Sequence, residues 1–217
     1  MTCLVIPGAG SAGLAWQDAA ALLGARIVPV PDAPDVAAMA ALVEPEVSAA
    51  ARPRVLIGTS LGAMVALELA RRVELDALVL VAAGFGIAVA DSVLEWVAAN
   101  PPDLLEKMSR SGLADREDER VIAIRLEDFR RRGQPVLARH LAALGAYRPE
   151  PLDDPPPTLV IWGEHDRAVP RADHEELARR CGGELVTIAG AGHAPFLEQP
   201  EHVVAAIRRF AVDAAPR

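Results

Sequence analysis

Residues 54 to 62 are Arg54-Val55-Leu56-Ile57-Gly58-Thr59-Ser60-Leu61-Gly62, an apolar run followed by a serine between two glycines. The apolar run predicts a short buried strand, and the residues from Leu61 onward predict a helix. A serine on so tight a strand-to-helix turn projects its hydroxyl away from the backbone. The first N–H groups of the helix stabilise negative charge that develops near the serine. The stretch therefore predicts a nucleophile at Ser60, the alternative being a serine that only caps the helix.

Similar short apolar runs recur on both sides of this stretch. We expect strands at residues 3–6, 26–30, 54–57, 77–81, 158–162 and 184–188. Several of these runs are continuous in Val, Ile and Leu, which is typical of strands buried on both faces of a parallel sheet. Helical patterns lie between them, for example at residues 61–72 and 201–210. The alternation predicts an α/β fold, with a mostly parallel sheet of about six strands and helices on both faces.

The alternation stops between residues 91 and 147, where no strand is expected. The segment instead predicts polar helices at residues 92–99, 102–110, 116–132 and 135–144, and a proline-rich stretch then leads into the next strand. We therefore expect a core formed by residues 1–90 and 149–217 and a helical lid at 91–148. An ordinary helical subdomain is the alternative. Trp96, Met108 and Phe129 are candidates to line an acyl pocket under the lid, although each is equally consistent with plain core packing.

A serine hydroxyl needs a general base, and His193 is the best placed of the five histidines. It lies in a glycine-rich loop just past an expected strand, where α/β sheets bind their ligands. Asp166 follows another expected strand and is the candidate acid that orients the histidine, with Glu164 as the competitor for that role. The chain order Ser60, Asp166, His193 is that of α/β-hydrolase triads.

The other four histidines are expected to have no catalytic role. His165 is adjacent to Asp166 and cannot easily point the same way, and the other three lie in helical patterns and are expected on the surface: His140, His174 and His202. The oxyanion hole is expected from two backbone N–H groups, that of Leu61 after the nucleophile and that of Ala9 in the loop after the first strand.

The sequence resembles lidded α/β-hydrolases, and is similar to small carboxylesterases and carrier-protein methyl ester esterases. The matching motifs are residues 58–62, residues 163–170 (Gly-Glu-His-Asp-Arg-Ala-Val-Pro) and residues 190–201 (Gly-Ala-Gly-His-Ala-Pro-Phe-Leu-Glu-Gln-Pro-Glu). The resemblance implies hydrolysis of a carboxylic ester, a thioester or a lactone through an acyl-serine intermediate, without a cofactor. A C–C hydrolase or lyase using the same residues is also consistent with it. The chain departs from the family in having Pro7-Gly8 where the family usually has His-Gly, and we expect the sheet to lack the usual first hairpin.

The N-terminal glycine loop supports a rival interpretation. Residues 8–13 have the pattern G-x-G-x-x-G after an expected strand, and Asp32 follows at the end of the next strand. This is the local fingerprint of a dinucleotide-binding turn, as in flavin- or nicotinamide-dependent oxidoreductases. We favour an oxyanion loop because Pro7 constrains the turn, and because the rival leaves the serine motif, Asp166 and His193 as three coincidences. A third possibility is a non-catalytic binding protein with a hydrolase fold.

Composition limits the partners that we expect. The 22 basic residues against 30 acidic ones give a net charge of −8, which argues against non-specific binding of nucleic acid. The one tight basic cluster consists of Arg130, Arg131 and Arg132. It is either a solvated helix face or a landing site for an acidic substrate or carrier. No apolar run is long enough to span a membrane. Two distant cysteines and the lack of a CxxC or HExxH motif predict no metal site, and the cysteines fit a reducing cytoplasm. The expected partner is the small-molecule ester or thioester that the resemblance implies.

Overall fold

The computed structural model describes residues 1–213, and its centre is a six-stranded sheet whose strands are all parallel. The strand order is β2-β1-β3-β4-β5-β6. The strands are β1 (Thr2–Ile6), β2 (Arg26–Ile27), β3 (Arg54–Thr59), β4 (Ala77–Val81), β5 (Thr158–Gly163) and β6 (Glu184–Ile188). The predicted α/β class, the parallel sheet and the number of strands are confirmed.

Strand β2 is shorter than the sequence predicts. It ends at Ile27, although a strand was expected as far as Val30. Pro29 and Pro31 explain the difference, because proline has no N–H to continue a ladder of hydrogen bonds. The chain leaves the sheet here, and the Pro31 carbonyl and the Gly10 N–H both contact the ring of His140.

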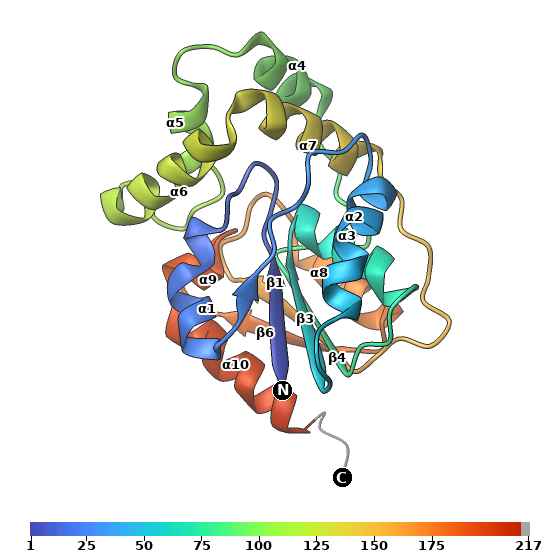
Figure 1. Cartoon of the computed structure of the whole chain (residues 1–217). Helices are drawn as coiled ribbons and strands as arrows, with labels where there is room; N and C mark the ends of the chain where they lie inside the picture. Colours follow the sequence, from blue (N-terminus) through green and yellow to red (C-terminus); the bar gives the residue numbers. More distant parts are fainter. Residues whose placement is uncertain (214–217) are drawn as a thin grey trace.

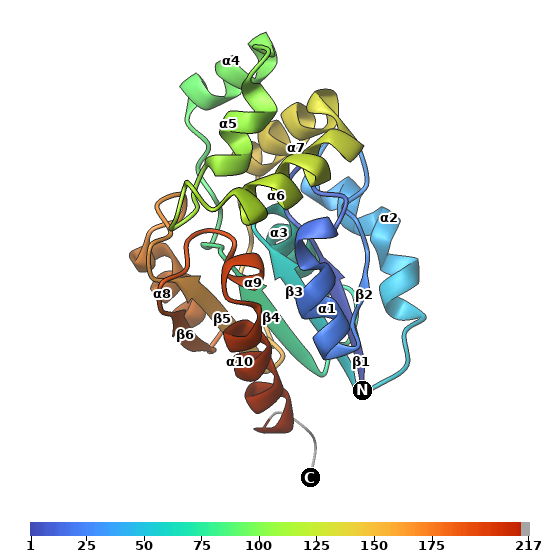
Figure 2. The same cartoon turned by 90° about the vertical axis from the view of Figure 1, so that its left-hand side faces the viewer.

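Helices cover both faces of the sheet (Figures 1 and 2). The core on one face includes side chains from α2 (Val36–Ser48), α3 (Leu61–Ala70) and α8 (Arg171–Arg180). The core on the other face includes side chains from η1 (Leu14–Trp16), α1 (Gln17–Leu23), α9 (Pro195–Glu198) and α10 (Pro200–Asp213). The central strands β3, β4 and β5 consist mainly of apolar residues because both of their faces are buried in this way.

Four helices between β4 and β5 lie over the carboxyl ends of the strands (Figures 1 and 2). They are α4 (Asp91–Ala99), α5 (Leu104–Arg110), α6 (Glu119–Arg132) and α7 (Gln134–Ala146). The predicted helices are present, but α6 begins at Glu119 and not at Arg116. The carboxylate of Asp118 accepts the N–H groups of Arg120 and Val121, and this cap fixes the start of the helix. None of the helices within residues 1–213 is long and apolar enough to cross a membrane.

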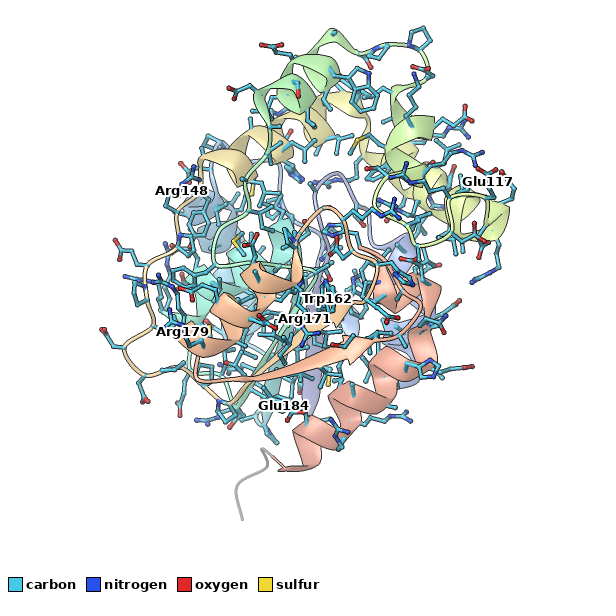
Figure 3. All side chains as sticks on the ribbon, turned by 180° about the vertical axis from the view of Figure 1, so that it is seen from behind. Glu117, Arg148, Trp162, Arg171, Arg179 and Glu184 are labelled. Atoms are coloured by element: carbon cyan, nitrogen blue, oxygen red, sulfur yellow. The ribbon has the colours of Figure 1, made fainter. Side chains whose placement is uncertain are left out.

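The outer strand β6 forms one edge of the sheet, seen from behind in Figure 3. Glu184, at its start, pairs with Arg209 of α10 at 3.1 Å. Near the middle of the same view, the Arg171 guanidinium lies over the ring of Trp162, 5.4 Å from its centroid. Charged side chains at an exposed edge oppose its pairing with another chain.

The expectation that His140 and His174 are surface residues is wrong, because both are fully buried. Each ring bonds the backbone of a loop. His174 Nε2 accepts the N–H of Ala83, and its Nδ1 lies 3.0 Å from the Pro170 carbonyl. Burial lowers the pKa of both histidines below the ordinary value. His202, on α10, is exposed as expected.

The cluster at 130–132 is not a uniform solvated face. Arg130 is exposed, and Arg131 is exposed and pairs with Glu127 one turn earlier. Arg132 is half-buried, and it donates a hydrogen bond of 2.6 Å to the carbonyl of Val30. Consecutive helical residues point in different directions, so one member of the cluster binds the loop after β2 while the others face solvent.

Candidate active site

Ser60 occupies a strained turn between β3 and α3. Its backbone angles are φ 51° and ψ −116°, a conformation that residues other than glycine rarely adopt. The Ser60 N–H donates to the carbonyl of Val81 on the neighbouring strand β4. A Cβ at Gly62 would collide with the carbonyl oxygens of Ile6 and Pro7, so only glycine lets α3 start this close to β1. The sequence motif is therefore required by backbone geometry.

Asp166 and His193 are hydrogen-bonded to each other. Asp166 Oδ2 lies 2.8 Å from His193 Nδ1, and the other oxygen of the carboxylate accepts the N–H groups of Ala168 and Val169. The Asp166 side chain is fully buried, whereas that of His193 is 19% exposed. Burial opposes ionisation of Asp166, but these hydrogen bonds outweigh it and hold the pKa of the carboxyl below its ordinary value. The pair can fix the histidine tautomer and stabilise an imidazolium.

Glu164, the competing acid, lies elsewhere. Its exposed carboxylate accepts the N–H of Gly190 at 3.0 Å, in the loop that carries His193. Its nearest histidine is His165, at 3.9 Å. Glu164 thus supports the loop, while Asp166 contacts the imidazole.

The backbone of the His193 loop is fixed by Glu198 and by the linker between α5 and α6. The Glu198 carboxylate accepts the N–H groups of Gly192 and Ala194, and also that of Ala114 in the linker. The His193 N–H donates to the Gly112 carbonyl at 2.7 Å. The helical segment and the histidine loop are therefore joined by hydrogen bonds.

Ser60 and His193 line one cavity of about 510 Å³ beneath the helical segment. Trp96, Met108 and Phe129 line the same cavity. Within the described residues, the Ser60 hydroxyl makes no hydrogen bond to His193. Such bonds are often long before substrate binds.

Several residues that line this cavity are not predicted by the sequence motifs. Trp16 and Phe196 stack with their rings 3° from parallel and centroids 4.3 Å apart, and Trp16 Nε1 donates to Thr59 beside the serine. Two arginines, Arg125 and Arg167, also line the cavity. Phe196 follows the histidine motif directly, and this adjacency was the available signal. No sequence signal marked Trp16 as a cavity residue, because a tryptophan after a glycine loop is equally typical of the hydrophobic core.

In the loop after β1, the N–H groups of Gly8 and Ala9 have no acceptor among residues 1–213. Between residues 9 and 16, each other N–H donates within the chain. The acceptors are His140 Nδ1 for Gly10, the Gly8 carbonyl for Ser11, Asp128 for Ala12, Leu14 and Ala15, the Ser11 hydroxyl for Gly13, and the Gly13 carbonyl for Trp16. In the part of the chain that the structure describes, neither the Ala9 N–H nor that of Leu61 has a protein acceptor. Ala9 also lines the cavity.

The dinucleotide interpretation of this loop conflicts with the geometry. The place of a bound anion is taken by the Asp128 carboxylate of α6, which accepts the N–H groups of Ala12 and Leu14 at 2.7 and 3.0 Å. Asp32 lies beyond the end of β2 and forms an ion pair with Arg139 of α7. The glycine loop thus has no free anion site, and Asp32 is not at the end of a strand, so two parts of the fingerprint fail. Within residues 1–213, no group of three or more His, Cys, Asp or Glu is arranged to hold a metal ion.

Comparison with known proteins agrees with this geometry. The family model described as "Alpha/beta hydrolase family" matches residues 3–207. Over 196 residues the chain is 30% identical to the pimeloyl-[acyl-carrier protein] methyl ester esterase of Stenotrophomonas maltophilia, covering 78% of this chain and 73% of that protein.

Solved structures of esterases and a lactonase have the same fold. A thermophilic esterase superposes with a TM-score of 0.84 and 25% identity, over 99% of this chain and 90% of that one. The enol-lactonase from Burkholderia xenovorans LB400 superposes with a TM-score of 0.82 and 19% identity, over 97% and 91% of the two chains. At 19% identity the second likeness concerns the fold alone.

Proposed function

This chain belongs to the alpha/beta hydrolase family, and we propose that Ser60, His193 and Asp166 form the triad with which it hydrolyses carboxylic esters. The observation that carries the proposal is the Asp166–His193 hydrogen bond at the wall of the cavity that Ser60 also lines. A base oriented by a buried carboxylate, beside a strained serine, is the arrangement that acyl transfer requires.

In the proposed acylation step, His193 Nε2 takes the proton of the Ser60 hydroxyl while Oγ attacks the ester carbonyl. The imidazolium that forms is stabilised by the Asp166 carboxylate, which stays ionised because its pKa is held low. His193 then returns the proton to the leaving alcohol as the C–O bond breaks. The products of this step are the free alcohol and an acyl-Ser60 ester.

In the proposed deacylation step, His193 activates a water molecule. The water attacks the acyl carbonyl, the bond to Ser60 Oγ breaks, and the proton passes through His193 back to the serine. The products are a carboxylic acid and the original enzyme, so no cofactor is needed. In both steps the negative oxygen is stabilised by the N–H groups of Ala9 and Leu61, which have no acceptor among residues 1–213.

We assign the helical segment at residues 91–148 as a lid, with residues 1–90 and 149–213 as the core. Residues 214–217, which the predicted core also includes, lie outside the described residues. Its position over the carboxyl ends of the strands supports this assignment. Trp96, Met108 and Phe129 would form the apolar wall for the acyl chain, and closure over the site would exclude water.

The substrate is a small ester or thioester, and the acyl group is limited by the 510 Å³ cavity. The carrier-protein esterase among its relatives favours an acyl group presented on a carrier, with the exposed Arg130 and Arg131 as a landing site. Both cysteines are free and buried, which supports a reducing compartment such as the cytoplasm.

Kinetics with p-nitrophenyl esters and acyl thioesters of graded chain length test this function. We expect saturable hydrolysis of the esters or of the thioesters, with kcat/KM highest at one acyl chain length. No turnover of any member, with Ser60 also unreactive towards a fluorophosphonate, would contradict it.

A further inference from the structure

The Asp128 side chain links the helical segment to the glycine loop after β1. Asp128 lies on α6, and its carboxylate accepts four hydrogen bonds from residues more than 110 positions earlier. The donors are the Ser11 hydroxyl at 2.5 Å and the N–H groups of Ala12, Leu14 and Ala15 at 2.7, 3.0 and 3.4 Å. The residue is only 2% exposed.

A buried carboxylate is costly unless it is fully hydrogen-bonded, and these four donors offset that cost. The same bonds fix the loop, because both carboxylate oxygens contact it: Oδ1 accepts from Ala12 and Leu14, and Oδ2 from Ser11 and Ala15. Ser11 relays the restraint further, since its oxygen accepts the N–H of Gly13. Asp128 therefore determines where the first turn of the loop lies.

The neighbouring helix α7 restrains the other end of this turn. His140 Nδ1 accepts the N–H of Gly10 at 3.2 Å, and its Nε2 lies 3.0 Å from the carbonyl of Pro31. With an acceptor at Nδ1, the ring donates through Nε2. Gly10 is thereby held directly next to Ala9, whose N–H has no acceptor among the described residues.

We propose that Asp128 is a positioning residue that holds the Ala9 N–H where it meets the oxyanion, with His140 as its partner. The inference rests on the proposed function. Asp128 does not touch the reacting atoms in this account. It accepts the N–H groups of Ala12, Leu14 and Ala15 and so fixes the turn that follows Ala9, while His140 accepts that of Gly10. The oxyanion site is then complete only when α6 and α7 are docked. A misplacement of about 1 Å at such a donor can cost on the order of a hundredfold in rate.

The test compares Asp128→Asn with Glu127→Gln, in the p-nitrophenyl ester series described above. Glu127 is the adjacent residue on α6, is exposed and pairs with Arg131, so its variant makes the same change of charge outside the loop. We expect Asp128→Asn to lower kcat by about 10- to 100-fold with KM changed less than threefold, because the amide can satisfy only part of the donor set. Glu127→Gln should leave both constants unchanged.

The affinity of a transition-state analogue separates a positioning role from a purely structural one, because a loss of stability alone would not change it. A trifluoromethyl ketone forms an anionic adduct with the serine, so its affinity depends on the oxyanion donors. We expect its Ki to rise in Asp128→Asn by the same factor as kcat/KM falls. If Asp128→Asn does not fold, Ser11→Ala is used in its place, because it removes one of the four donors. The same two quantities are measured, kcat and the Ki of the ketone, and we expect smaller changes in both.

Three results would overturn the proposal. The first is a variant that loses thermal stability but keeps kcat and Ki within threefold. The second is a rise in kcat, which would mean that the negative charge of Asp128 opposes the oxyanion more than its bonds help. The third is an equal loss in Glu127→Gln. In all three cases the wild-type protein still hydrolyses the ester and Ser60 is still labelled. Failure of the proposed role of Asp128 can therefore be distinguished from failure of the proposed function.

Discussion

His193 Nδ1 lies 2.8 Å from Asp166 Oδ2, and the carboxylate of Glu164 accepts a backbone N–H of the same histidine loop. The two acids are two residues apart, yet one contacts the imidazole and the other contacts only the loop backbone. The difference follows from the turn after β5, where the Asp166 N–H donates to the Gly163 carbonyl and the side chain turns inward.

Asp166→Asn should lower kcat far more than Glu164→Gln. The amide would favour the wrong imidazole tautomer and would leave the imidazolium uncompensated, and losses on the order of 10⁴-fold are known for such changes. Glu164→Gln removes an exposed charge but keeps an oxygen that can accept the Gly190 N–H, and we expect less than a tenfold effect. Steady-state kinetics on the best ester substrate measure both. The reverse ranking would assign the orienting role to Glu164.

Purified protein should bind no dinucleotide. The Asp128 carboxylate occupies the N–H groups that a pyrophosphate would need, and its negative charge would repel that ligand. The solution should lack flavin absorbance, and titration with NAD(H) or NADP(H) should give no saturable calorimetric or fluorescence signal. A copurified flavin or a micromolar affinity would support the rival interpretation of the loop.

Alanine substitutions of Trp96, Met108 and Phe129 should shift the preferred acyl chain length. Each side chain lines the cavity, and one methylene in an apolar pocket is worth about 1–3 kcal/mol, roughly 10- to 200-fold in relative kcat/KM. The p-nitrophenyl ester series measures the profile, and labelling of Ser60 by a fluorophosphonate is the control that should change little. If all three variants lose stability with an unaltered profile, the helical segment is a packing subdomain and not a selective lid.

Stability should fall as the pH drops below about 6.5. Burial lowers the pKa of His140 and His174, so the unfolded chain binds protons there before the folded chain does. The stabilisation is complete above the unfolded pKa of about 6.5 and is lost as the pH falls towards the folded pKa. Each histidine contributes a slope of up to about 1.4 kcal/mol per pH unit in this window.

Urea unfolding between pH 5 and 8 measures this slope. His174→Gln should reduce it, because a neutral side chain at this position no longer titrates. The exposed His202 provides the control, and His202→Gln should keep the wild-type slope. An unchanged slope in His174→Gln would show that another group causes the acid sensitivity.

The sequence predicted the strands and the serine turn because their signals are local. The apolar run before Ser60 and the two glycines lie within nine residues, and backbone sterics there leave few alternatives. The early end of β2 was also readable in principle from Pro29 and Pro31, but the apolar neighbours Val28 and Val30 masked the signal.

Asp128 and His140 could not be placed in the same way. Their partners in the glycine loop lie 116 and 130 residues away, and no local pattern encodes that contact. A partial signal existed for Asp128, since it lies seven residues after the buried Val121 on the inward face of α6. A lone acid on an apolar stripe is a candidate for a buried hydrogen-bond acceptor. For His140, the helical pattern alone led to the prediction of an exposed side chain, whereas the side chain is buried.

Labelling of Ser60 tests the central claim most directly. Incubation with a fluorophosphonate probe, followed by proteolysis and mass spectrometry, should identify one modified residue, Ser60. Ser60→Ala should abolish labelling and lower turnover of the best ester by about a thousandfold or more, while the fold remains intact by circular dichroism. Labelling at a different residue, or full activity in Ser60→Ala, would contradict the assignment of Ser60 as the nucleophile.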